Sequence, residues 1–319
     1  MMSQTPPATR LGHSFFGFRR CWRLHAFAPL IVLPALLVVD LEASQPLASG
    51  LRCLVLERHD LDPATWRAMG ALGANLVATI RPPSPETDQT AGMAGLAYLA
   101  FLTSDEIESF VNDPARVAEA RAERNLAGFY YLDASAAAEG FTTPEVQQRA
   151  YTALKGLFPD KLVLYPTRLD PIVWSPDFLD LYFRPEFTDL VTPYFYPVGT
   201  TILGEAREQD DWPKRLAALL AALAPRVPGG KGILPVLQGY EQKGYPVSER
   251  FPAAQLSVYR QIWPDLADAA FDGWELPGPE PLLAELANLP TLQRGVCSLF
   301  AGLAGPPARC RLRPTLAWR

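Results

Sequence analysis

The stretch Leu126-Ala-Gly-Phe-Tyr-Tyr-Leu-Asp133 is a short apolar and aromatic run that ends on one acid. Small residues follow it at once, and helical patterns lie on both sides, over residues 113–125 and 144–158. In parallel α/β proteins, a buried strand between two helices brings its last side chain to the carboxyl edge of the sheet. The stretch therefore predicts a central strand of a (β/α)8 TIM barrel, with Asp133 on the active face.

Seven further segments have strand character, and helical patterns separate most of them. The second predicted strand follows the first at a spacing of about twenty-five residues, with a helical pattern between them, which is typical of βαβ units. The segment 96–102 also fits a helix, because alanine and leucine suit both states. One barrel domain over residues 50–290 accounts for the whole pattern. The predicted strands are 51–57, 75–80, 96–102, 126–133, 161–166, 188–197, 231–238 and 270–276.

The N-terminal region has the pattern of an export signal. Three arginines between residues 19 and 23 precede an uncharged run over residues 26–39, and small residues follow at 43–44. This run suits a signal peptide and is short for a membrane span, which needs about 20 residues. Residues 1–43 therefore predict a signal peptide or an uncleaved membrane anchor, and an exported protein that is periplasmic or extracellular.

The cysteines fit the same interpretation. Residues 291–319 form a predicted C-terminal tail, in which Cys297 and Cys310 can form a disulfide if the protein is exported. Cys53 lies in a predicted strand, where a buried free thiol acts as a small hydrophobic side chain.

Composition narrows the chemistry further. The net charge is −5 and the body has no lysine or arginine cluster, so nucleic acid is not an expected partner. His59 is the only histidine after the leader, and no CxxC spacing occurs, so neither a metal site nor a cofactor is predicted. The nucleophile-elbow pattern GxSxG is absent as well. Catalysis would depend on carboxylates and tyrosines.

The strand ends of a barrel share one face, so the last residues of the predicted strands converge there. Carboxylates and amides bind sugar hydroxyls, aromatic rings stack on sugar faces, and two carboxylates can divide the roles that glycosidic cleavage needs. The predicted catalytic residues are Asp133 as general acid/base and Glu275 or Glu57 as its partner. The predicted substrate-binding residues are Tyr131, Tyr165, Tyr194, Tyr196, Gln238, Trp274 and Arg81.

Side-chain alternation puts Phe129, Tyr131 and Asp133 on one face, so Tyr131 is expected to point into the barrel below Asp133. This arrangement resembles the fourth strand of chitinase-like and related TIM-barrel glycosidases, where acids recur at every second residue. Here aromatic residues replace the lower acids, and the full Asp-x-x-Asp-x-Asp-x-Glu signature is absent. An acid followed by a small residue at this strand end also resembles other glycoside-hydrolase-like barrels. The resemblance implies a TIM barrel that acts on glycans.

Three hypotheses about function follow. The first is an exported glycoside-hydrolase-like protein that cleaves a polysaccharide by carboxylate general acid/base chemistry. The second is a non-catalytic carbohydrate-binding barrel of an envelope or polysaccharide-secretion system, which Gln238 favours because many barrels carry a carboxylate at that strand end. The third is a barrel lyase or isomerase that uses Tyr194 or Tyr196 as acid or base. Two carboxyl groups about 5–10 Å apart across the mouth would support hydrolysis.

Overall fold

The chain divides into two units, Met1–Gln45 and Pro46–Arg319. The first unit lies outside the described residues, as does the predicted signal or anchor segment. No helix among the residues described is both long and apolar enough to cross a membrane. The computed structural model describes residues 50–56, 62–132, 142–169, 177–197, 199–200, 206–207, 211–242, 246–272, 283–284 and 289–305.

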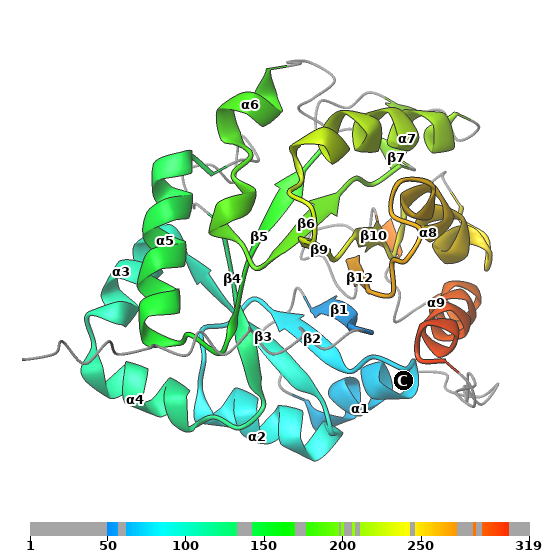
Figure 1. The fold of residues 1–319 in the computed structure, drawn as a ribbon. Coiled ribbons are helices and arrows are strands. Elements are labelled where there is room, and N and C mark those ends of the chain that lie inside the picture. The colour runs from blue at the N-terminus through cyan, green and yellow to red at the C-terminus, as the bar shows by residue number, and fades with distance from the viewer. Residues whose placement is uncertain are drawn as a thin grey trace, which may run out of the picture. The chain divides into compact units, whose positions relative to one another are not determined.

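Within the described part of the chain, eight parallel strands close into a barrel, which confirms the predicted TIM-barrel fold (Figure 1). Neighbours along the sheet follow the order β10-β12-β1-β2-β3-β4-β5-β6-β9, and pairing of β10 with β6 closes it. Because Leu234-Pro235 interrupts the seventh barrel strand, this strand consists of β9 and β10. The barrel strands are β1 (Arg52–Leu56), β2 (Leu76–Thr79), β3 (Ala97–Thr103), β4 (Leu126–Leu132), β5 (Leu162–Arg168), β6 (Leu190–Tyr194), β9 (Gly232–Ile233), β10 (Val236–Gln238) and β12 (Ala269–Asp272).

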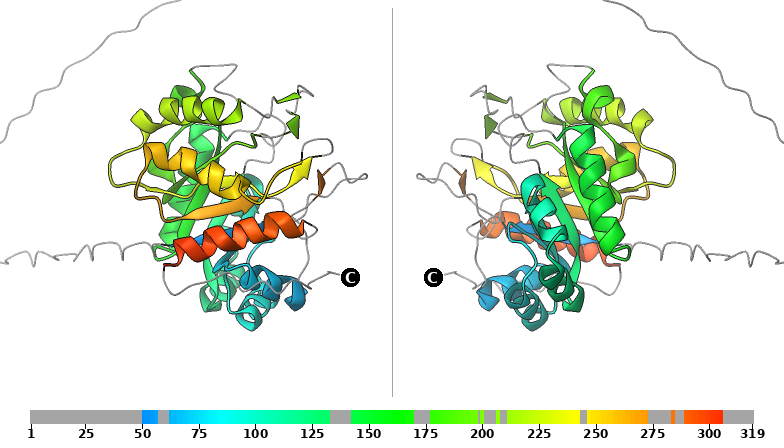
Figure 2. Two further views of the ribbon diagram at one scale, coloured as in Figure 1. Left: turned by 90° about the vertical axis from the view of Figure 1, so that its right-hand side faces the viewer. Right: turned by 90° about the vertical axis from the view of Figure 1, so that its left-hand side faces the viewer.

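Helices surround the barrel on its outside (Figures 1 and 2). Two small antiparallel pairs, β7 with β8 and β11 with β13, lie apart from the barrel sheet. The helices are α1 (Pro63–Ala71), α2 (Pro85–Ala94), α3 (Ser104–Val111), α4 (Pro114–Ala122), α5 (Pro144–Leu157), α6 (Phe178–Tyr182), η2 (Pro185–Phe187), α7 (Trp212–Leu223), η3 (Ala224–Arg226), α8 (Phe251–Ile262) and α9 (Pro290–Leu303), and the short strands are β7 (Gly199–Thr200), β8 (Ala206–Arg207), β11 (Glu241–Gln242) and β13 (Leu283–Ala284).

Local sequence signals set where the helices begin. The Asp62 carboxylate accepts a hydrogen bond from the Ala64 amide at the start of α1, and Pro63 occupies the first turn. Thr103 and Glu106 form a capping box at the start of α3. Because this cap ends β3, the ambiguous segment 96–102 is a strand.

The apolar core has two parts, one inside the barrel and one between the strands and the helices. The outer part is much the larger, because each strand buries one face against helices that cover the whole barrel. Cys53 is a free, buried cysteine of the inner part, as predicted, and burial raises the pKa of its thiol to about 12. The fully buried members of the inner part are Cys53, Leu76, Ala78, Leu99, Leu164, Leu190, Leu234 and Ala270.

The end of the chain departs from prediction. The helix α9 covers Pro290–Leu303, within the predicted tail, and Leu283–Ala284 form the short strand β13. Phe300 of α9 is buried and its ring lies 5.6 Å from that of Phe271, so the first part of the predicted tail packs in the core between the strands and the helices. Cys297 is disulfide-bonded, while its predicted partner Cys310 lies outside the described residues.

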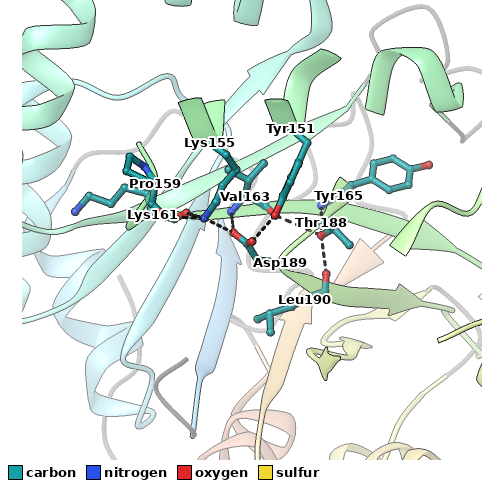
Figure 3. Close-up of polar contacts among 9 residues, drawn as sticks. All are labelled: Tyr151, Lys155, Pro159, Lys161, Val163, Tyr165, Thr188, Asp189 and Leu190. Carbon is teal, nitrogen blue, oxygen red and sulfur yellow. Dashed lines mark hydrogen bonds and ion pairs between the residues drawn. The ribbon is translucent and has the colours of Figure 1, made fainter. Parts of the chain in front are cut away.

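Asp189, which precedes β6, ties α5 to the amino ends of β5 and β6 (Figure 3). Its carboxylate accepts hydrogen bonds from the Tyr151 hydroxyl at 2.9 Å, the Val163 amide at 2.8 Å and the Lys155 ammonium at 3.1 Å. Charge-assisted bonds of this kind are among the stronger ones in proteins. Because they lie at the amino ends of the strands, they stabilise the barrel at the end opposite the expected site.

A buried acid, Glu123, lies at the end of α4. The Tyr98 hydroxyl of β3 donates a hydrogen bond to its Oε2, and its Oε1 is buried with no hydrogen-bond partner among the residues described. Burial raises the pKa of Glu123 to about 7, and the nearby charges of Asp88 and Glu119 act in the same direction. The hydrogen bond from Tyr98 opposes this increase, but burial outweighs it.

Glu123→Gln is therefore expected to change how stability depends on pH. Because the pKa of Glu123 in the folded state lies above its unfolded value, its contribution is full below pH 4.5 and is lost as the pH rises to about 7. Relative to wild type, the variant should gain about 2 kcal/mol of unfolding free energy across this range. Urea unfolding at a series of pH values measures the difference. Glu108→Gln, at an exposed site on α3, is the control, and equal pH profiles for both variants would contradict the prediction.

Candidate active site at the carboxyl ends of the strands

The carboxyl ends of the barrel strands meet at one end of the barrel. Because side chains alternate along a strand, a residue two or four positions from a member of the inner core also faces the interior of the barrel. Partners in a parallel pair point the same way, and three register pairs connect these positions: Phe101 with Tyr130, Arg168 with Tyr194, and Gln238 with Asp272. We call this end of the barrel the mouth. Its inward-facing residues are Phe101, Tyr130, Arg168, Tyr194, Gln238 and Asp272.

Asp272, the last residue of β12, is the acid among these inward-facing residues of the mouth. The hydroxyl of Tyr196, just beyond β6, donates a hydrogen bond to its Oδ2. Asp272 is only 8% exposed, and its Oδ1 is buried with no hydrogen-bond partner among the described residues. Its main-chain carbonyl accepts a hydrogen bond from the Gly239 amide at 2.7 Å. Among the described residues, the carboxylate is thus held by a hydrogen bond to Oδ2 and by none to Oδ1.

Tyr196 remains protonated in this arrangement. Burial, together with the negative charge of Asp272, raises the pKa of its hydroxyl well above the ordinary value. A phenol in this state donates a hydrogen bond and does not exchange its proton readily near neutral pH. This disfavours Tyr196, one of the two tyrosines named in the lyase or isomerase hypothesis, as an acid or base.

Two groups of aromatic rings flank the mouth. On one side, the ring of Tyr196 lies 5.5 Å from that of Tyr194 and 5.4 Å from that of Tyr240. On the other side, the rings of Phe101 and Tyr130 are 5.0 Å apart. Except for Tyr240, which is buried, these side chains are partly exposed. Rings that keep one exposed face can stack on the apolar face of a sugar.

Gln238 ends the seventh barrel strand, and it is fully buried. Its main chain is held by the Gln255 side chain of α8, which accepts from the Gln238 amide at 2.9 Å and donates to its carbonyl at 3.0 Å. The Gln238 side chain donates to the Tyr240 carbonyl at 3.2 Å, which fixes the following loop. At this position, an amide that supports the loop takes the place of a carboxylate.

Two predicted substrate-binding residues face away from the mouth, so their predicted placement is wrong. The Tyr131 hydroxyl donates to the carbonyls of Gln147 and Phe187, both at 3.3 Å, in the layer between the strands and the helices. The Tyr165 hydroxyl accepts from the Thr142 amide at 3.1 Å, and its ring belongs to the same outer core. Both side chains therefore contribute to packing in the outer layer.

The physical reason is that β4 carries aromatic rings on both faces. Tyr130 faces inward, while Phe129 packs outward, with its ring 5.0 Å from that of Phe158. Alternation shows which residues share a face, but it does not show which face is inside. Since β4 is buried on both sides, its composition gave no basis for that choice.

The remaining predicted residues fall into two groups. Arg81 is half-buried just after β2, where its main-chain carbonyl accepts from the Phe101 amide at 2.8 Å. No group of three or more potential metal ligands occurs among the residues described. Asp133, Glu57, Trp274 and Glu275 lie outside the described residues, so their roles remain predictions.

The sequence-based prediction missed Phe101, Tyr130, Arg168 and Asp272 at the mouth. Asp272 was placed inside a strand over residues 270–276, whereas β12 ends at Asp272 itself. The available signal was Asp272-Gly273, because an acid followed by glycine commonly marks a turn. This signal would have shortened the strand and placed Asp272 at its carboxyl end.

No protein-family model and no curated protein matches this sequence, but many solved structures share its fold. An endocellulase from the archaeon Pyrococcus horikoshii superposes with a TM-score of 0.52 and 11% identity, over 79% of this chain and 92% of that one. A GH5_18 protein from Bifidobacterium longum subsp. infantis gives 0.50 and 14% identity, over 77% of this chain and 74% of that one.

A β-glucuronidase from Bacteroides uniformis is also similar, with a TM-score of 0.44 and 12% identity. The match covers 70% of this chain and only 30% of that enzyme. Identities this low show a common fold and nothing finer. The chain has the fold of glycoside hydrolase TIM barrels.

Proposed function

We propose that this protein is a glycoside hydrolase that cleaves a polysaccharide by carboxylate general acid/base chemistry. The observation that best supports this proposal is the mouth itself, where the buried carboxylate of Asp272 lies beside partly exposed aromatic rings. Rings for stacking and a carboxylate for hydroxyl groups form a combination suited to carbohydrate. The barrel fold, common to glycoside hydrolases, is consistent with this function.

Asp133 is the proposed general acid/base. It directly follows Leu132, the last residue of β4, so the alternation that turns Phe129 and Tyr131 outward does not fix its direction, and the carboxyl end of a barrel strand is where such groups are placed. In glycosidic cleavage, one carboxyl group protonates the leaving oxygen, while a second attacks the sugar or activates water. Glu275 or Glu57, which follow β12 and β1 in the sequence, would supply the second group.

The proposed site of action is outside the cytoplasm. The arginines and uncharged run within residues 1–43 support export to the periplasm or the extracellular space. If this segment is not cleaved, residues 26–39 would anchor the protein to a membrane. Either location would give the protein access to an envelope or secreted polysaccharide.

Asp133→Asn is expected to lower kcat at least 100-fold on the polysaccharide that wild type cleaves, because the amide cannot protonate the leaving oxygen. Affinity for the same glycan should remain within about threefold, since the substituted group is similar in size. Release of reducing ends and calorimetric binding measure the two quantities. Asp160→Asn, on an exposed turn, is the control and should keep full activity. Full activity of Asp133→Asn would contradict the assignment.

The alternative is a non-catalytic carbohydrate-binding barrel of an envelope or polysaccharide-secretion system. Gln238 favours this alternative, because its strand end carries a buried amide. A protein of this kind would bind oligosaccharides yet release no reducing ends from them during prolonged incubation. The assay described for Asp133 therefore distinguishes the two functions with wild-type protein alone.

A further inference from the structure

We propose that Asp272 determines glycan specificity at the mouth: its Oδ1 accepts a hydrogen bond from a hydroxyl group of a neutral sugar, and Tyr196 is the positioning residue that holds the carboxylate for this contact. The inference rests on the proposed function and names the chemical class of sugar that this part of the site takes.

The two oxygens of Asp272 have different surroundings. Oδ2 accepts from the Tyr196 hydroxyl, while Oδ1 is buried without a hydrogen-bond partner in the described part of the chain. A buried polar atom without a hydrogen-bond partner destabilises the protein, because it has lost its contacts with water and gained none in return. A hydroxyl donor on a ligand would satisfy Oδ1 and remove this cost.

The backbone around Asp272 leaves little freedom to satisfy Oδ1 internally. β12 is paired on both sides, with β10 and with β1. Gly239 approaches so closely that a Cβ there would lie 2.5 Å from the Asp272 carbonyl oxygen. Because the main chain is paired on both sides and Tyr196 holds Oδ2, a hydroxyl group of a bound sugar is the donor that we expect for Oδ1.

The surroundings favour a neutral sugar at this position. The rings of Tyr194, Tyr196 and Tyr240 form a continuous group beside the carboxylate, suited to the apolar face of a sugar. A uronic acid carboxylate placed against Asp272 would put two like charges together where burial reduces solvent screening. Arg168 lies at the end of β5 and pairs in register with Tyr194, so β6 and β10 separate its strand from that of Asp272.

Tyr196 is well suited to its positioning role. The elevated pKa of its hydroxyl keeps it a donor across the usable pH range. Tyr196→Phe retains the ring and its contacts with Tyr194 and Tyr240 but frees Oδ2. The carboxylate can then rotate, so selectivity should weaken while stacking persists.

The test is calorimetric titration of the full chain with two panels of hexasaccharides, one of neutral hexoses and one of uronic acids. We expect wild type to bind its best neutral ligand at least tenfold more tightly than any uronic acid ligand. Asp272→Asn should weaken neutral binding 10- to 100-fold and strengthen uronic acid binding, because the like charge is removed. Tyr196→Phe should weaken neutral binding about three- to tenfold. Asp265→Asn, at an exposed position before β12, is the control and should behave as wild type.

The outcomes separate the inference from the proposed function. If wild type binds no member of either panel, the proposed function fails, and this inference fails with it. If wild type binds but Asp272→Asn binds equally well, or loses both ligand classes equally, the inference is overturned and the proposed function stands. If Asp272→Asn does not fold, Tyr196→Phe decides, since unchanged selectivity in that variant would also overturn the inference.

Discussion

Gly128→Ala is expected to lower the free energy of unfolding by about 3 kcal/mol or more, because the new Cβ has no room. Gly128 pairs with Leu162 of β5, and a Cβ at this position would lie 2.2 Å from the Leu162 carbonyl oxygen and 2.6 Å from its Cβ. The nearest atom belongs to the backbone of a central strand, so it cannot move aside without disturbing the barrel. Urea unfolding measures the loss.

Gly156→Ala provides the matched control for this substitution. Gly156 lies on the exposed side of α5, and a Cβ there meets no atom within 4 Å. Alanine is the better helix former, so this variant should gain about 0.5–1 kcal/mol. If both variants changed stability by the same small amount, a close approach of β4 and β5 would be excluded.

Phe129→Ala should cost about 3–5 kcal/mol, as expected for removal of a fully buried aromatic ring. Phe129 lies between α3 and α5, where its ring is 5.9 Å from that of Phe110 and 5.0 Å from that of Phe158. The ring of Phe158 also stacks with that of Phe110 at 6.0 Å, so the three rings support one another. The loss should appear as a lower urea midpoint with an unchanged slope.

A double-mutant cycle with Phe158→Ala tests this placement directly. Residues in contact show non-additive effects of about 0.5–3 kcal/mol, whereas distant ones add. Leu181→Ala, at a side chain 54% exposed, should change stability by no more than about 0.5 kcal/mol. Strict additivity of Phe129→Ala and Phe158→Ala would show that Phe129 does not pack in this outer layer.

Much of the fold was predictable because local signals agreed with the global pattern. Caps such as Asp62 mark helix starts, and buried strands alternate with helices along the chain, which limits the arrangement to a parallel α/β fold. The prediction was less reliable toward the C-terminus. There, Asp272 ends a strand predicted to continue to residue 276, and α9 lies in the predicted tail.

The site was only partly predictable. Tyr194, Tyr196 and Gln238 lie at the mouth as expected from their positions at strand ends, whereas Tyr131 and Tyr165 lie in the outer core. Most strand ends can be located from sequence, because turns and caps mark them, although β12 ends earlier than predicted. The direction of a side chain cannot be inferred when both faces of a strand are apolar.

By itself, the sequence determined the barrel, because the spacing of apolar segments and caps depends on residues near one another in the chain. Tertiary structure decided which carboxylate lies beside the tyrosines. Asp272 and Tyr196 are 76 positions apart, and they meet because closure of the barrel brings the ends of β6, β10 and β12 together. The contact follows from strand register and from the inward phase of each strand, and these are set by packing of the complete barrel.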